Sequence, residues 1–295
     1  MGGEFFTLSP KGDLPADQRQ DDAGSLVFET EPLSEAIEIL GRPALSIRVA
    51  IDAPTGNLIA RLVDVHPDGV AHRVSFGVLN LAYRRDQTAP SAMTPGAFET
   101  VMIKFDECGH RFLPGHRLRL AISTAYWPLI LPPPTAVTAT FDLDADSRLT
   151  LPTRKGGDRL EVAEPEDPDP LPKYRRITPD ASRRWVKRDL IAGLTRYHVV
   201  VDTGEVEIAA ADGLVARELR QETYTIDPTE PLSAVSECRW EMTRQRGDWH
   251  VRTTSNTRLT ADSTHFHIAG QLIAYDANGQ IFRRDWADAI ERGLL

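Results

Sequence analysis

A proline–glycine turn followed by a strictly alternating segment restricts the fold of this chain more than any other feature. The turn lies at residues 114–115, and the alternating segment, 117–123, follows almost directly. Because side chains alternate between the two faces of a strand, Leu118, Leu120 and Ile122 share one face and two arginines share the other. The segment therefore predicts an antiparallel strand with one buried face and one basic face.

Further short segments with the same alternation run through the first half of the chain. Residues 44–52 are the clearest case, and no convincing amphipathic helix interrupts the series. The 21 prolines and 20 glycines are scattered, which suits short strands joined by many turns. Similar segments lie at 26–30, 57–65, 73–83, 98–107 and 136–144. The pattern predicts an all-β sandwich.

A run of alternating prolines and acidic residues at 164–173 predicts an extended, solvated linker. We therefore expect a β-sandwich domain at residues 25–163 and a second β domain at residues 174–295. Residues 1–24, which are polar and acidic for much of their length, are expected to form an extended lead-in.

The second domain is expected to have longer strands joined by tight turns. These turns are predicted at 202–204, 246–248 and 278–279. Cys238, Trp240 and Met242 share one face, so the domain should be an antiparallel meander with one apolar side. A curl of the sheet, another domain or a second copy of the chain would have to cover that side. Residues 286–294 could form one short helix.

Composition and charge disfavour several classes of partner. The net charge of −9 argues against nucleic acid, because phosphate backbones select basic surfaces. No run approaches the ~20 apolar residues of a membrane span, and no signal peptide is visible at the N-terminus. Cys108 and Cys238 are expected to be reduced thiols, since a disulfide framework needs more pairs. These features fit a cytoplasmic protein without a membrane partner.

The sequence lacks the common catalytic and cofactor-binding motifs. The nucleophile motif G-x-S-x-G needs two glycines four positions apart, and no two glycines have this spacing. The patterns G-x-G-x-x-G, G-x-x-x-x-G-K-[ST], H-E-x-x-H and C-x-x-C are also absent. We therefore expect no catalytic residue, no metal and no cofactor.

Four residues are candidates for an interface or a ligand site. Arg117 and Arg119 could bind an anion, although long basic side chains on a solvent-exposed or interface face are the more ordinary interpretation. Tyr126 and Trp127 could stack on a sugar ring, but an aromatic plug at a domain interface is favoured.

Histidines occur near other potential ligands in three places, and each place has an ordinary explanation. His265 and His267 point the same way on a predicted strand but have no third ligand nearby in the sequence. His66 lies between Asp64 and Asp68, where a carboxylate could orient it for base catalysis, but a turn in which acidic side chains accept local backbone hydrogen bonds is the favoured interpretation. The third group, at a strand end and a turn, consists of Cys108, His110 and His116. Neither the pair His265 and His267 nor this third group is expected to hold a metal.

Four motifs occur in the order found in a known group of hydrolases. They are L-x-D-V-x-P-D-G at 62–69, G-x-L-x-L at 77–81 with Arg84 after it, a proline–glycine turn at 95–96, and F-x-P-G-H-R-L-R-L-x-I-S at 112–123. Over roughly residues 3–157 the chain resembles the C-terminal β-sandwich of the cocaine-esterase/X-prolyl-dipeptidyl-peptidase (CocE/NonD) group of serine hydrolases.

The resemblance implies a jelly-roll, galactose-binding-like sandwich that does no chemistry. Members of the group carry a Ser-His-Asp triad in an α/β-hydrolase domain that precedes this sandwich, so residues 1–24 would lead in from a catalytic domain that this chain lacks. The implied partner is that catalytic domain, in the same chain or as a separate one. The sandwich would pack on it, shape its substrate cleft and support homo-oligomers.

Two other functions stay open on the sequence alone. The chain could be a stand-alone carbohydrate- or ligand-binding jelly-roll module, with Tyr126, Trp127 and Trp185 as contacts. It could also be an enzyme with a new site in the second domain, centred on His265 and His267. The favoured hypothesis is the non-catalytic hydrolase domain.

Overall fold

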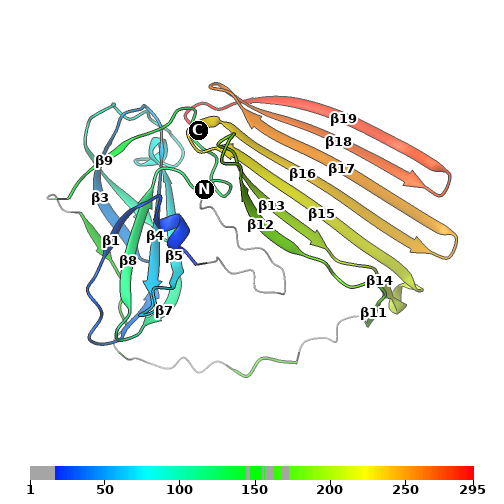
Figure 1. The fold of residues 1–295 in the computed structure, drawn as a ribbon, viewed down its shortest axis with the longest axis horizontal. Helices are drawn as coiled ribbons and strands as arrows, with labels where there is room; N and C mark the ends of the chain where they lie inside the picture. The colour runs from blue at the N-terminus through cyan, green and yellow to red at the C-terminus, as the bar shows by residue number, and fades with distance from the viewer. Residues whose placement is uncertain (1–16, 144–146, 155, 157–162, 168–172) are drawn as a thin grey trace. The chain divides into compact units, whose positions relative to one another are not determined.

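The computed structural model describes residues 17–143, 147–154, 156, 163–167 and 173–295, and it confirms the predicted all-β fold (Figure 1). The chain divides into two compact units. Unit 1 comprises residues 1–159 and 293–295, and unit 2 comprises residues 160–292. Most of the expected lead-in, residues 1–16, and part of the expected linker, residues 168–172, lie outside the described residues.

Unit 1 is a sandwich of short antiparallel strands, as the alternating segments predict. Its elements are α1 (Arg19–Asp22), β1 (Leu26–Glu29), β2 (Ile37–Gly41), β3 (Ala44–Ile51), β4 (Asn57–Val65), β5 (Ala71–Asn80), η1 (Leu81–Tyr83), β6 (Glu99–Lys104), β7 (Cys108–Phe112), β8 (Arg117–Ser123), β9 (Ala139–Asp142) and β10 (Arg148–Thr150). Although the sequence predicts an extended lead-in, α1 forms one helical turn within it.

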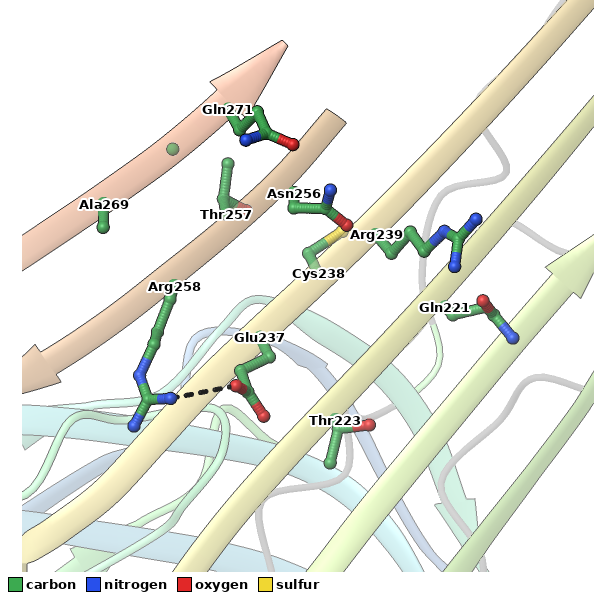
Figure 2. Close-up of a pocket in the computed structure, with 11 residues that line it drawn as sticks. Gln221, Thr223, Glu237, Cys238, Arg239, Asn256, Thr257, Arg258, Ala269 and Gln271 are labelled. Carbon is green, nitrogen blue, oxygen red and sulfur yellow. Dashed lines mark hydrogen bonds and ion pairs between the residues drawn. The ribbon is translucent and has the colours of Figure 1, made fainter. Parts of the chain in front are cut away.

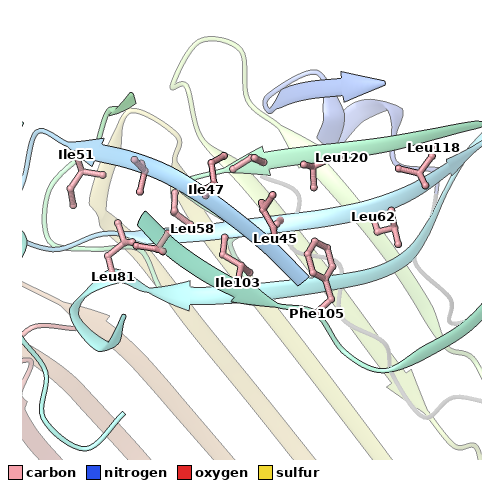
Figure 3. Packing of buried hydrophobic residues seen from close by; sticks show 14 of the residues in the cluster. Leu45, Ile47, Ile51, Leu58, Leu62, Leu81, Ile103, Phe105, Leu118 and Leu120 are labelled. Carbon is pink, nitrogen blue, oxygen red and sulfur yellow. The ribbon is translucent and has the colours of Figure 1, made fainter. Parts of the chain in front are cut away.

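Two sheets enclose the core of unit 1. One has the strand order β1-β8-β4-β5, and the other has the order β10-β3-β6 with β9 also paired to β3. Strands β2 and β7 form a separate two-stranded sheet. The core side chains that meet between the strands include Leu45, Ile47, Leu62, Ile103 and Leu120 (Figure 3). Burial of these apolar groups is the main force that holds the unit together.

The motif-bearing strands lie at the centre of this sandwich. Strand β8 pairs with both β1 and β4, and Leu118, Leu120 and Ile122 are buried as predicted. Gly77 of β5 lies where β6 passes closely, because a β-carbon there would be 2.5 Å from the carbonyl oxygen of Lys104. The glycine of the G-x-L-x-L motif is therefore required by packing.

Unit 2 is one antiparallel sheet of longer strands. Its elements are β11 (Tyr174–Arg176), β12 (Arg183–Arg188), β13 (Thr195–Asp202), β14 (Val206–Ile208), η2 (Ala209–Ala211), β15 (Leu214–Asp227), β16 (Glu230–Arg246), β17 (Trp249–Ala261), β18 (His265–Asp276) and β19 (Gly279–Glu291). Strands β15 to β19 pair in sequence order, which confirms the predicted meander (Figure 1). The predicted turns between β16 and β17 and between β18 and β19 are also present.

Two sequence-based expectations about unit 2 are wrong. The segment expected to be a short helix continues strand β19, which pairs with β18 as far as Glu291, so its backbone hydrogen bonds go to the neighbouring strand. The second error is the turn at residues 202–204. Strands β13 and β14 both pair antiparallel with β15, so the chain keeps its direction across these residues, which interrupt the row of β13 and β14.

One face of the sheet of unit 2 carries apolar side chains together with charged ones, because Arg220 pairs with Trp240 and Arg284 with Leu272. Register pairs connect Trp240 to Ser255 and Ser255 to Leu272, which places Trp240 and Leu272 on one face. Within the described part of unit 2, no second layer of secondary structure packs on this face, and Trp240 remains 37% exposed. Among the same described residues, no helix is long and apolar enough to cross a lipid bilayer.

Candidate functional site

The two candidate arginines of β8 point into an open pocket of about 460 Å³ in unit 1. Arg119 contacts Asp22 at 2.7 Å and Glu29 at 2.6 Å, while Arg117 donates to the carbonyl oxygen of Thr30 at 2.9 Å. Both guanidinium groups are therefore already engaged with this chain. An anionic ligand would have to compete with the carboxylates that neutralise them.

A buried arginine that the sequence analysis did not single out lies beside this pocket. Arg61 of β4 is 1% exposed, and its guanidinium contacts Asp22 at 3.0 Å and Gln18 at 2.8 Å. It also donates to the hydroxyl of Ser25 at 2.9 Å and lies 5.5 Å from the ring centre of Tyr126. The helical turn α1 is thereby attached to the sandwich by a buried charge pair.

Tyr126 and Trp127 are buried in the structure, at 2% and 4% exposure. Burial raises the pKa of Tyr126, and its hydroxyl accepts a hydrogen bond from Arg73 at 2.7 Å. Neither ring offers an open face to a sugar, which counts against a stacking platform at this position. Trp185 in unit 2 is more accessible, at 37% exposure, and one of its faces stacks on His198.

Half of the histidines of the chain gather around one buried carboxylate in unit 1. This histidine cluster consists of Asp64, His66, His72, His110 and His116. Asp64 is 3% exposed, and its two oxygens contact Nε2 of His110 at 2.9 Å and Nδ1 of His116 at 2.8 Å. The ring of His66 lies 4.4 Å from that of His116 and 4.5 Å from that of His72, centre to centre.

Several strands bring the histidine cluster together. Asp64 is near the end of β4 and His72 lies opposite it on β5, while His110 is on β7 and His116 directly precedes β8. Atoms of Asp64, His66 and His116 that could bind a metal all lie within 4.8 Å of one another. In the sequence, Asp64 and His66 belong to one group and His110 and His116 to another, and only the folded strands show that they form one cluster.

The histidines of unit 2 make a different arrangement. The rings of His265 and His267 lie 6.2 Å apart, and His267 contacts the carboxylate of Asp262 at 2.7 Å. That contact, with backbone hydrogen bonds from Thr264 and His265, holds the pKa of Asp262 well below its usual range. No other metal-binding side chain joins them among the described residues.

One face of the sheet of unit 2 carries a second open pocket, of about 540 Å³. Figure 2 shows side chains of β15 to β18 around it, including the ion pair between Glu237 and Arg258 at 3.2 Å. Polar groups such as Gln221, Asn256 and Gln271 line the rest. In the described parts of both units, no serine hydroxyl is hydrogen-bonded to a histidine, so neither pocket holds a poised serine nucleophile.

Comparison with known protein families gives a match over half of the chain. Residues 7–160 match the model of the "X-Pro dipeptidyl-peptidase C-terminal non-catalytic domain". The match covers the sandwich of unit 1, with both the arginine pocket and the histidine cluster, and it leaves unit 2 outside.

Individual relatives and solved structures match less than half of this chain. The cocaine esterase of Rhodococcus sp. (strain MB1 Bresler) is 33% identical over 116 residues, which are 39% of this chain and 20% of that protein. The chain thus spans about a fifth of the length of this curated relative. Among solved structures, an α-amino acid ester hydrolase is 24% identical with a TM-score of 0.46, covering 48% of this chain and 28% of that one. An aminopeptidase from a Thaumarchaeota archaeon is 24% identical with a TM-score of 0.39, covering 41% and 22%.

Proposed function

Because the chain belongs to the family of the X-Pro dipeptidyl-peptidase C-terminal non-catalytic domain, we propose that it is the non-catalytic C-terminal portion of a serine esterase or peptidase. Its partner would be an α/β-hydrolase catalytic domain, encoded in the same chain or separately. The single observation that carries this proposal is the family match over residues 7–160. The absence of G-x-S-x-G from the sequence supports it, because the nucleophile must then come from elsewhere.

In this role unit 1 would pack on the catalytic domain and bound its substrate cleft. A jelly-roll topology is part of the proposal, as is a cytoplasmic location, which the free thiols of Cys108 and Cys238 support. The exposed hydrophobic side chains of unit 1, such as Phe98 at 39% and Met102 at 55%, are available for such a contact.

A chimera tests the docking role. Residues 7–160 would replace the matching segment of the Rhodococcus cocaine esterase, and the esterase truncated before that segment is the control. We expect the chimera to label with a fluorophosphonate probe and hydrolyse p-nitrophenyl esters better than the truncated enzyme, whereas the chain alone does neither. Covalent labelling of any serine in the chain alone would overturn the proposal. A folded chimera no more active than the truncated enzyme would overturn the docking role.

Homo-oligomerisation is the second part of the proposal, and the edge strand β19 supports it. This strand pairs with β18 on one side only, so its other edge presents unpaired backbone groups. It has 13 residues, and apart from Trp286 all of them are exposed. An exposed edge of this length is a template for pairing with another strand.

The sequence of β19 is complementary to itself. If two copies pair antiparallel about Trp286, residues equally far from it lie opposite each other, so Arg284 faces Asp288 and Phe282 faces Ile290. Within the described residues, the side chains of Arg284 and Asp288 have no hydrogen-bond or ion-pair partner in their own chain. The proposed pairing would give both of them a partner.

Charge exchange distinguishes this pairing from an unspecific association. Size-exclusion chromatography with light scattering should give a dimer for the full chain and a monomer for Arg284→Asp, where two pairs become repulsive. The double variant Arg284→Asp/Asp288→Arg should restore the dimer, and Arg246→Asp, which carries the same charge change on another strand, should leave it intact. A monomeric parent chain, or a dimer unaffected by Arg284→Asp, would contradict the proposed pairing.

A further inference from the structure

The buried carboxylate of Asp64 has unusual surroundings. Burying an ionised carboxylate is costly unless an opposite charge or metal compensates it. In the described part of the chain no lysine or arginine forms an ion pair with Asp64, and its contacts are the rings of His110 and His116. The two imidazole rings satisfy both of its oxygens through hydrogen bonds.

The neighbouring rings add donors at the same place. His116 is 8% exposed, and His66, which is only half-buried, packs beside it. Metal-binding atoms of Asp64, His66 and His116 lie within 4.8 Å of one another, a span compatible with one ion at bond lengths of about 2.0–2.2 Å after small side-chain rotations. His66 also lines the open pocket beside Arg117, which gives an ion a path from solvent.

We propose that Asp64, His66 and His116 bind a divalent transition-metal ion, with Zn²⁺ as the best fit. Two imidazoles and one carboxylate are ligands that Zn²⁺ accepts in a tetrahedral site, with water from the pocket in the fourth position. Ca²⁺ and Mg²⁺ are disfavoured because they select oxygen ligands. The ion would take the place of the proton in the hydrogen bond between Asp64 and His116, that proton would be released to solvent, and the ion would compensate the buried charge.

His110 would be a positioning residue in this site. Its Nε2 contacts Oδ2 of Asp64, the oxygen that His116 does not use, and so it can orient the carboxylate toward the ion. The ion would link the end of β4 to the turn before β8, so binding should stabilise unit 1. Because binding to the folded state alone raises stability, the melting temperature should rise with the zinc concentration.

The test uses the full chain after treatment with EDTA and removal of the chelator. Calorimetric titration with ZnCl2 should show one ion per chain, and Co²⁺ should give the visible absorption of a tetrahedral site. In His66→Gln, where the exchanged side chain is half-exposed, affinity should fall at least about tenfold while the circular dichroism spectrum stays unchanged. His267→Gln, an exposed histidine of unit 2, is the matched control and should bind like the parent chain.

Three outcomes would overturn the zinc site. The first is the lack of stoichiometric binding by the parent chain. The second is unchanged affinity in His66→Gln, and the third is loss of binding in His267→Gln or Cys238→Ser, which would place the ion in unit 2. The site does not depend on a catalytic partner, so a failed chimera leaves this result interpretable.

Discussion

The indole ring of Trp286 lies on the backbone of Gly270, its direct register partner on the neighbouring strand. A β-carbon at Gly270 would be 2.1 Å from Cζ2 of Trp286, which is closer than two carbon atoms can approach. A glycine inside a strand normally weakens it, but an aromatic side chain from the next strand can cover the exposed backbone. This contact joins β18 to the edge strand β19.

We predict that Gly270→Ala destabilises unit 2 by about 1–3 kcal/mol, because the new methyl group forces the indole ring out of its position. Urea unfolding monitored by tryptophan fluorescence would measure the loss. The double variant Gly270→Ala/Trp286→Leu removes the ring that clashes, so it should recover part of the difference. A single variant as stable as the parent chain would show that the ring does not rest on Gly270.

The buried pair of Arg61 and Asp22 gives a second prediction. Arg61→Met should lower the unfolding free energy of unit 1 by about 3–5 kcal/mol, because Gln18 and Ser25 lose their donor and a buried charge network is broken. Arg117→Met, an arginine of β8 in the same unit, is the control and should cost less than about 1 kcal/mol, since the Arg117 side chain is 36% exposed.

A double variant sharpens the same prediction. In Arg61→Met, the buried carboxylate of Asp22 keeps only its contact with Arg119. The double variant Arg61→Met/Asp22→Asn removes the charge of that carboxylate as well. The two changes should be less than additive in denaturant unfolding, because both break one network. Strict additivity would mean that Arg61 and Asp22 act independently.

The fold was largely predictable because alternation marks strands wherever one face is buried. Strands β3, β4, β6 and β8 follow the predicted segments closely. The second half of strand β19 was mispredicted as a helix. A strand exposed on both faces has no apolar periodicity that distinguishes it from a short helix. The prediction at residues 202–204 failed for another reason. Asp-Thr-Gly is a sequence that favours a turn, but β13 and β14 both pair with β15, so the chain continues in one direction.

The candidate site was less predictable from the sequence. Asp64 lies about 50 residues before His110 and His116 in the sequence, and only the folded strands bring the three side chains together. The burial of Arg61 was also hidden, because a charged residue in a mostly apolar strand could mark a solvent-facing side chain. The sequence did offer one signal of this burial. The run of β4 is almost continuously apolar, which is typical of a strand buried on both faces, and the structure buries all of it.

The pair of Asp202 and Arg217 gives a prediction about pH. The hydrogen bond from Arg217 lowers the pKa of Asp202 below 3.8, although burial opposes the shift. A carboxyl whose pKa is lower in the folded state stabilises the fold above its unfolded pKa, and this stabilisation is lost as pH falls through the folded value. Asp202→Asn should therefore be less stable than the parent chain at neutral pH, by less than about 1 kcal/mol because Arg217 is partly exposed.

Acid titration of the unfolding midpoint would check this dependence. The difference between the parent chain and Asp202→Asn should shrink as pH falls below about 4. Asp248→Asn, in the exposed turn between β16 and β17, is the control for removing one carboxylate. A difference that grows at low pH would mean that the contact with Arg217 does not stabilise the ionised form.

The two cysteines should react slowly as thiols. Burial raises the pKa of both Cys108 and Cys238, and the carboxylate of Glu222, opposite Cys238 on β15, raises that of Cys238 further. Because the thiolate is the nucleophile, both should react with DTNB at pH 7.5 more slowly in the folded chain than in urea, where two thiols per chain should appear. Cys238→Ser separates the two reactions, and Glu222→Gln should speed the reaction of Cys238 while leaving that of Cys108 unchanged. Rapid labelling of the folded chain at the urea rate would show that neither thiol is shielded.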